Sequence, residues 1–133
     1  MGYRWITARD ALIIHEAQLV EHGGKFGFKD ENALESAMMR ARHKALYGHP
    51  AVHDLAASYA WAIAKNHPFI DGKKRVALVV CESFLEYNGY LLTASDEECV
   101  EILLRVAASE ITEEELSIWI SGRISANVSP PAL

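Results

Sequence analysis

The sequence predicts an all-α fold, a single compact six-helix domain with a buried central helix. Apolar residues recur at helical spacing in six segments, residues that can cap a helix precede most of these segments, and glycine follows several of them. The chain has 133 residues and is 50% hydrophobic, which suits one domain with an ordinary core. We expect this domain to span residues 1–126 and the segment 127–133 to be a disordered tail.

The first three helices are bounded by capping residues and glycine. Thr7 begins a capping-box pattern, and the apolar segment that follows it stops at Gly23-Gly24. Asp30 can cap a second helix, which ends near Tyr47-Gly48. A third helix, with apolar residues at helical spacing, runs from about Val52 to Lys65. These three elements account for the first half of the chain.

The other three helices follow the same rules. The fourth runs from about Lys73 to Tyr87 and is apolar on most sides, which is typical of a central helix with neighbours packed around it. It stops at Asn88-Gly89, and Tyr90 to Thr93 form a short extended piece. Ser95 and Thr112 each have Glu three residues later, so each is expected to begin a helix through a capping box.

The composition argues against several classes of protein. The formal net charge is −5 and most basic residues are scattered, so we expect no direct DNA binding. No apolar run approaches the roughly 18 residues of a membrane span, so no membrane partner is expected. Cys81 and Cys99 lack the spacing of a metal site, and we interpret them as buried thiols in a reducing cytoplasm.

The stretch HPFIDGKKR at 67–75 places basic residues where a helix does not favour them. Lys73, Lys74 and Arg75 fall in the first turn of the fourth helix, and the amino end of a helix already carries a partial positive charge. A bound phosphate explains this arrangement, because free backbone N–H groups at a helix start bind phosphate. Gly72 lets the backbone approach such a ligand closely.

The same stretch contains acid–base and metal-binding groups. Asp71 beside a phosphate site is a typical ligand for Mg²⁺. His67 can take a proton from a hydroxyl that attacks phosphorus. Phe69 is expected to point inward and hold the loop to the core. A base, a metal carboxylate and cationic donors indicate phosphoryl or nucleotidyl transfer, since positioning and charge stabilisation supply most of its catalysis.

These residues resemble the signature of the Fic/Doc superfamily, and more closely its death-on-curing (Doc) toxin branch. The Fic pattern is H-P-F-x-x-G-N-G-R-x-x-R, and the Doc pattern is H-x-F-x-[DN]-[AG]-N-K-R. The segments EHGGKFGFKDENALESAMMRARHKALYG, AASYAWAIAKNHPF and ESFLEYNGYLL also resemble the family, so the similarity extends over about residues 5–123.

The resemblance implies a role for each residue of the motif. His67 would be the catalytic base, Phe69 the structural anchor and Asp71 the Mg²⁺ ligand. Gly72 and Lys73 would form the phosphate-binding turn, and Lys74 and Arg75 would contact phosphate and take part in catalysis. Lys65 and Asn66, which precede the motif, are candidates for contact with the nucleotide or the target, although an ordinary surface role is the alternative.

The resemblance also implies the reaction. Fic enzymes have Gly at the place of Lys74 and transfer AMP, whereas Doc toxins have Lys there and use ATP to phosphorylate a threonine of elongation factor Tu. Lys74 therefore favours a kinase, and so does Leu78 at the place of the second Fic arginine. Lys73 departs from the Asn of both patterns and offers a mobile charge in place of a neutral amide. An AMP transferase and an attenuated toxin that mainly binds its antitoxin remain alternatives.

The resemblance further implies a protein partner. In Doc modules the antitoxin is a small DNA-binding protein, Phd-like, whose C-terminal segment folds onto the toxin. The inhibitory pattern [ST]-x-x-x-E-[GN] of some Fic proteins has no match in this chain. We therefore expect inhibition to come from a second chain.

Three further features carry weaker interpretations. Gly23 to Phe28 form either a loop that positions a target over the site or a plain connection between helices. His49 and His53 are four residues apart, but Pro50 between them and the lack of a third ligand disfavour a metal site. His15 and His22 are expected at the surface or its boundary.

Overall fold

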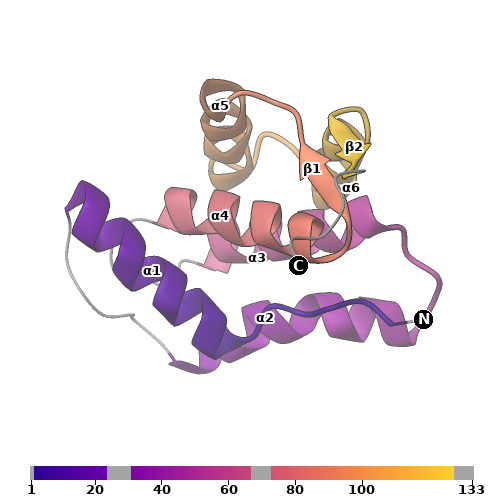
Figure 1. Ribbon diagram of the computed structural model, residues 1–133, viewed down its shortest axis with the longest axis horizontal. Helices are drawn as coiled ribbons and strands as arrows, with labels where there is room; N and C mark the ends of the chain where they lie inside the picture. Colours follow the sequence, from indigo (N-terminus) through magenta and orange to yellow (C-terminus); the bar gives the residue numbers. More distant parts are fainter. Residues whose placement is uncertain (1, 24–30, 67–72, 128–133) are drawn as a thin grey trace.

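The computed structural model describes residues 2–23, 31–66 and 73–127 of the chain. In this part of the chain the all-α expectation is confirmed, with one short two-stranded sheet added (Figure 1). The elements are α1 (Ala8–His22), α2 (Glu31–Leu46), α3 (Val52–Asn66), α4 (Lys73–Tyr87), β1 (Tyr90–Leu92), α5 (Asp96–Ala107), α6 (Glu113–Ser121) and β2 (Ile124–Ala126).

Capping boxes begin α1, α5 and α6, as the sequence predicts. At the start of α6, the Thr112 hydroxyl accepts a hydrogen bond from the backbone N–H of Glu115 at 3.1 Å, and the Glu115 carboxylate accepts from the N–H of Thr112 at 2.9 Å. Thr7 with Asp10 and Ser95 with Glu98 repeat this reciprocal pattern. Each box satisfies two N–H groups that a helix start otherwise leaves unpaired. Asp30, the expected cap of α2, lies outside the described residues.

The core is built around α3 and α4, which pack against each other through the middle of the molecule. In Figure 1, α5 and α6 lie on one side of this pair and α2 on the other. The expectation that α4 is a core helix is confirmed, since Val76, Ala77, Val80 and Phe84 are each 0% exposed. Helix α3 is buried even more completely, and its many small side chains let four other helices approach it. Its buried positions are 52, 55–60 and 62–64.

The N-terminal segment completes the core through aromatic side chains. The indole of Trp5 stacks on the ring of Phe84 with centroids 5.9 Å apart and an interplanar angle of 28°. Tyr3 donates its hydroxyl hydrogen bond to the backbone oxygen of Pro50 at 3.1 Å. The Asn88 side chain bonds the backbone N–H and oxygen of Arg4, at 2.8 and 3.0 Å. The segment before α1 is therefore fixed to the end of α4 and to the connection between α2 and α3.

A two-stranded antiparallel sheet closes the C-terminal side of the domain. Tyr90 pairs with Ala126 and Leu92 with Ile124. The extended piece at 90–93 is thus a strand, but its partner β2 is not among the predicted elements. The backbone N–H of Asn127 donates to the oxygen of Gly89 at 2.8 Å, so the pairing reaches the first residue of the predicted tail. The rest of that tail, 128–133, lies outside the described residues.

Burial corrects one expectation and supports another. His15, expected at the surface or boundary, is only 2% exposed, because it follows Ala11 and precedes Leu19 at four-residue spacing on the buried face of α1. Cys81 and Cys99 are buried free thiols, as expected, and burial raises the pKa of Cys99 to about 11. None of the described helices is long and apolar enough to span a membrane.

Candidate active site

The predicted motif connects the two most buried helices of the domain. Helix α3 ends at Asn66 and α4 begins at Lys73, so residues 67–72 join them. His67, Phe69, Asp71 and Gly72 lie in this connection, outside the described residues, and their roles stay predictions. The described part fixes where the connection starts and ends, on helices that pack along each other in the core. Both ends of the connection therefore lie on packed helices of the core.

The start of α4 is electropositive, as the sequence predicts. Its first turn contains Lys73, Lys74 and Arg75 and no acidic residue, whereas α1, α3, α5 and α6 each have a carboxylate in that turn. Arg75 is exposed, and Val76 and Ala77 directly after it are fully buried. The helix is therefore fixed in the core, and no carboxylate of its own first turn offsets the partial positive charge of its amino end.

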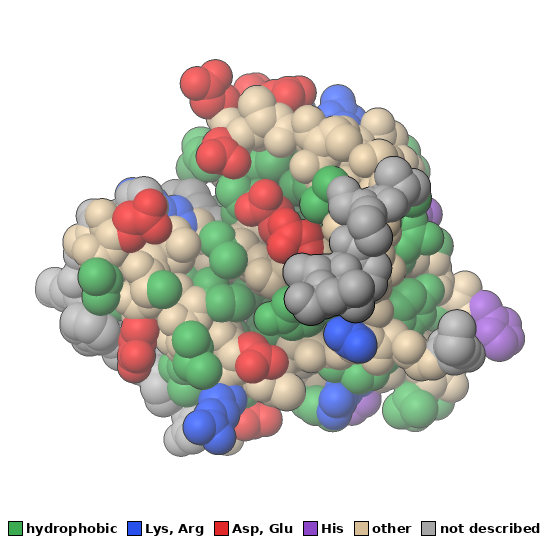
Figure 2. Space-filling view, viewed as in Figure 1, with side chains coloured by type: hydrophobic (Ala, Val, Ile, Leu, Met, Phe, Trp, Pro, Cys, Tyr) green, Lys and Arg blue, Asp and Glu red, His purple; other side chains and the backbone are tan. Residues whose placement is uncertain are grey.

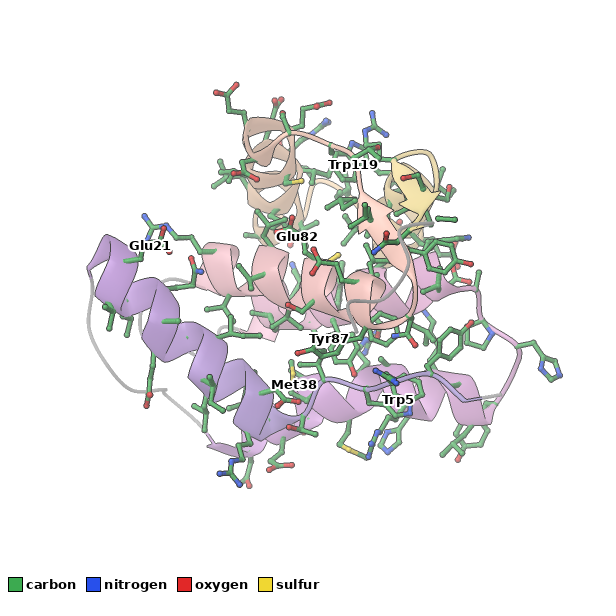
Figure 3. The ribbon with its side chains drawn as sticks, viewed as in Figure 1. Trp5, Glu21, Met38, Glu82, Tyr87 and Trp119 are labelled. Carbon is green, nitrogen blue, oxygen red and sulfur yellow. The ribbon has the colours of Figure 1, made fainter. Side chains whose placement is uncertain are left out.

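Carboxylates do occur on α4, but further along the helix. Glu82 is half-buried; burial raises its pKa, and the nearby carboxylates of Asp96 and Glu86 raise it further. Figure 2 shows acidic side chains over the α4 and α5 region on this face of the molecule, and Figure 3 labels Glu82 there. The basic amino end of α4 and the acidic face thus lie on different parts of the same helix.

The loop expected over the site begins on the appropriate side of the molecule. Figure 1 shows the end of α1, the start of α2 and the start of α4 on one side, and Glu21 near the end of α1 is labelled there in Figure 3. Helix α1 also packs against α4. Gly23 has a φ of 79°, a left-handed value that favours glycine. Residues 24–30 lie outside the described part, so the choice between a target-positioning loop and a plain connection stays open.

Lys65, the candidate contact just before the motif, is already engaged. Its ammonium donates a hydrogen bond to the hydroxyl of Ser109, in the turn between α5 and α6, and lies 5.9 Å from the centre of the Trp61 ring. An ammonium has three donors, so this bond leaves two for another partner. Contact of Lys65 and Asn66 with nucleotide or target stays a prediction.

Sequence reasoning missed a second polar cluster, between α2 and α6. Glu113 at the start of α6 accepts hydrogen bonds from Arg40 and Lys44 of α2. The only sequence signal is the four-residue spacing of the two cations, which places them on one face of a helix. Their partner is 73 residues away from Arg40 in the chain, and no local pattern indicates it.

Of the two histidines at four-residue spacing, His53 takes part in a hydrogen-bond network between α3 and α6. The imidazole Nδ1 of His53 lies 2.9 Å from the hydroxyl of Ser117, which donates to Asp54 at 2.6 Å. Burial acts to raise the pKa of Asp54, but the hydrogen bonds from Ser117 and Ala51 and the charge of His53 outweigh it and lower this pKa. His49 is exposed. Within 2–23, 31–66 and 73–127, no three His, Cys, Asp or Glu residues group to hold a metal ion.

Comparison with known proteins agrees with this architecture. A model of the Fic/DOC family matches residues 5–85. The protein named Toxin Doc from Mycolicibacterium smegmatis is 32% identical over 112 residues, which cover 80% of this chain and 85% of that protein. Protein kinase doc from Escherichia phage P1 is 28% identical over 110 residues, which cover 82% and 86%. The resemblance to the Doc branch is thereby confirmed, and the chain belongs to the Fic/DOC family.

Proposed function

We propose that this protein is the toxin of a toxin–antitoxin pair and acts as a protein kinase. It transfers the γ-phosphate of ATP to a threonine of elongation factor Tu and so arrests translation in the cytoplasm. The observation that carries the proposal is the basic, acid-free first turn of α4, which follows the HPFIDG loop directly and is held by the core. Similarity to proteins named Toxin Doc and Protein kinase doc supports it.

Each residue of the motif then has one task in the transfer. His67 accepts the proton of the target hydroxyl while the hydroxyl oxygen bonds to the γ-phosphorus and the bond to the bridging oxygen of ADP breaks. Asp71 would hold Mg²⁺, which would neutralise charge on the phosphates. Lys74 and Arg75 contact the phosphates from the start of α4. Phe69 fixes the loop.

The remaining residues surround the nucleotide. Gly72 and Lys73 form the turn around its phosphates, and Lys65 and Asn66 contact it or the target at the end of α3. A C-terminal segment of a Phd-like antitoxin inhibits the enzyme.

Lys73 supports a second candidate, an attenuated toxin that mainly binds its antitoxin. An ammonium at this place can bind phosphate, but it can also displace the phosphate or repel Mg²⁺, which a neutral amide does not. An AMP transferase is a weaker alternative, because Lys74 and Leu78 stand where Fic enzymes have Gly and Arg.

Labelled ATP separates these candidates. The purified chain is incubated with elongation factor Tu, Mg²⁺ and ATP labelled on the γ- or the α-phosphate. Label from γ alone, lost in His67→Ala, is the expected result for the kinase. Label from α would establish AMP transfer. No label from either, with γ-label gained in Lys73→Asn, would show that the natural chain is attenuated.

A further inference from the structure

A cleft between α2, α3 and the start of α6 has the features of a second ligand site. It has a volume of about 500 Å³, and Arg40, Lys44, Ser58 and Glu113 line it. None of its lining residues comes from α4: they belong to α2, Tyr47 just after it, the middle of α3 and the first residue of α6. None of these residues has a part in the proposed kinase reaction.

The carboxylate of Glu113 accepts hydrogen bonds from both cations of the cleft, Arg40 and Lys44. Oε1 of Glu113 accepts from Nε and Nη2 of Arg40 at 3.0 and 2.6 Å, and Oε2 accepts from Nζ of Lys44 at 2.5 Å. The Glu113 side chain is 13% exposed, whereas those of Arg40 and Lys44 are 48% and 39% exposed. Both cations are thus hydrogen-bonded to one carboxylate, and Asp54 interacts with Lys44 only through its charge. Donors of Arg40 and Lys44 remain for another oxygen.

An independent observation at the cleft points to a missing partner. Ser58 lines it, is 0% exposed, and has a hydroxyl without a hydrogen-bond partner in the described part of the chain. Buried hydroxyl groups are normally paired with protein or ordered water. The indole N–H of Trp61, whose ring lies 5.1 Å from the Arg40 guanidinium, is unpaired in the same way. Because the Ser58 hydroxyl is closed to solvent, a ligand reaches it only when a side chain that lines the cleft moves.

We propose that this cleft binds a dianionic oxyanion of the phosphate class, and that Glu113 holds the place of this anion in the free chain. Charge decides between anions. A monocarboxylate that displaces Glu113 leaves the charge balance unchanged, whereas a dianion neutralises both Arg40 and Lys44. Guanidinium, ammonium and hydroxyl donors also suit a tetrahedral anion, which presents oxygens in several directions.

The ligand is inorganic phosphate or a phosphoryl group carried by a small molecule. Both present the same oxygens, so inorganic phosphate and glycerol phosphate are the two probes. Sulfate is a second tetrahedral dianion, and acetate is the monoanionic control. Equal affinity for both phosphate probes would identify a site for the free ion and its esters alike, and preference for glycerol phosphate would identify a site for the ester.

The test is calorimetric titration of the folded chain at pH 7.5 and constant ionic strength. Glu113→Gln removes the internal competitor and is expected to tighten phosphate binding at least fivefold. Glu114→Gln, one residue further on the exposed surface of α6, is the matched control and leaves the affinity unchanged. Lys44→Gln, which removes a charge, is expected to weaken the affinity for phosphate about tenfold. Ser58→Ala is also expected to weaken it. Acetate gives no saturable heat.

The proposed kinase site also binds phosphate, so every titration is repeated in an Arg75→Gln chain. Binding that persists there and responds to Glu113→Gln supports the cleft. Phosphate binding that disappears in Arg75→Gln and is unaffected by Lys44→Gln would overturn this inference and leave the kinase proposal intact. Equal affinities in Glu113→Gln and Glu114→Gln would also overturn it. Thermal unfolding of each variant without ligand separates a loss of binding from a loss of folding.

Discussion

The side chain of Tyr59 and the backbone of Ile6 exchange two hydrogen bonds inside the core. The Tyr59 hydroxyl donates to the backbone oxygen of Ile6 at 3.2 Å and accepts from its N–H at 3.0 Å. The Tyr59 ring also packs against the ring of Phe84, with the two centroids 5.1 Å apart. Tyr59 is 0% exposed and Ile6 2%. A single hydroxyl thus satisfies both polar groups of one peptide segment where water has no access.

Tyr59→Phe is predicted to lower the free energy of unfolding by about 1–3 kcal/mol, because it leaves the N–H and oxygen of Ile6 buried without partners. Urea unfolding followed by circular dichroism measures the change. Tyr87→Phe is the matched control, since Tyr87 is 53% exposed, and it is expected to stay within about 0.5 kcal/mol. Equal stabilities of the two variants would contradict the pairing.

Alkaline pH is predicted to destabilise the fold through the same residue. Burial raises the pKa of Tyr59 to about 12, against an ordinary value near 10. The unfolded chain therefore releases this proton first, so the stabilisation is complete below pH of about 10 and is lost as the pH rises toward 12. The expected loss is of the order of 2 kcal/mol. Denaturant unfolding between pH 9 and 12 should show this decline in the natural chain and a smaller one in Tyr59→Phe.

Loss of a capping box is predicted to destabilise the domain modestly. Thr112→Ala removes the hydroxyl that accepts from the Glu115 N–H, and about 1 kcal/mol of stability should be lost. Ser125→Ala, on the exposed face of β2, changes a similar side chain outside any cap and should have little effect. The urea concentration at the unfolding midpoint is measured for both variants. A shift of the same size in both would rule out the cap as the cause.

Arg75→Gln is predicted to reduce phosphoryl transfer by about 100-fold while the fold stays intact, because a charged donor to the phosphates is lost from the first turn of α4. Arg105→Gln, in the last turn of α5, removes an equal charge elsewhere and should keep full activity. Initial rates with γ-labelled ATP compare the two, with circular dichroism as the check on folding. Unchanged activity in Arg75→Gln would exclude this arginine from the phosphate site.

Features that depend on neighbouring residues were predictable from the sequence, and those that depend on distant residues were not. The Ser95 and Thr112 caps need only a partner three residues away. Strand β2 pairs Ile124 with Leu92, and a segment of three residues has too little periodicity to reveal it. The near-complete burial of α3 was missed because alanine is compatible with both a surface and a core. His15 was misjudged as a polar residue although its spacing from Ala11 placed it on the buried face.

The same distinction applies to the sites. The motif at 67–75 is contiguous, so its residue types and their order indicate phosphate chemistry before any fold is known. The cleft with Arg40, Lys44 and Glu113 forms only when α6 packs on α3 and its first residue reaches α2. The spacing of the two cations hints at a shared face, but no sequence pattern indicates Glu113. The electropositive start of α4 depends on local sequence and on the fold. Its cations can be read from the sequence, and the core fixes its position.

The burial of α3 sets limits on how this chain can change over time. Most side chains of α3 face α2, α4, α5 or α6, so a larger side chain could be placed only at its partly exposed positions 53, 54, 61 and 65. Variation is therefore expected to accumulate on outward-facing positions such as those of α1, where Val20 is 81% exposed. The residues at the end of α3 that lead into the segment HPFIDG would then stay in one position while the outer surfaces diverge between relatives.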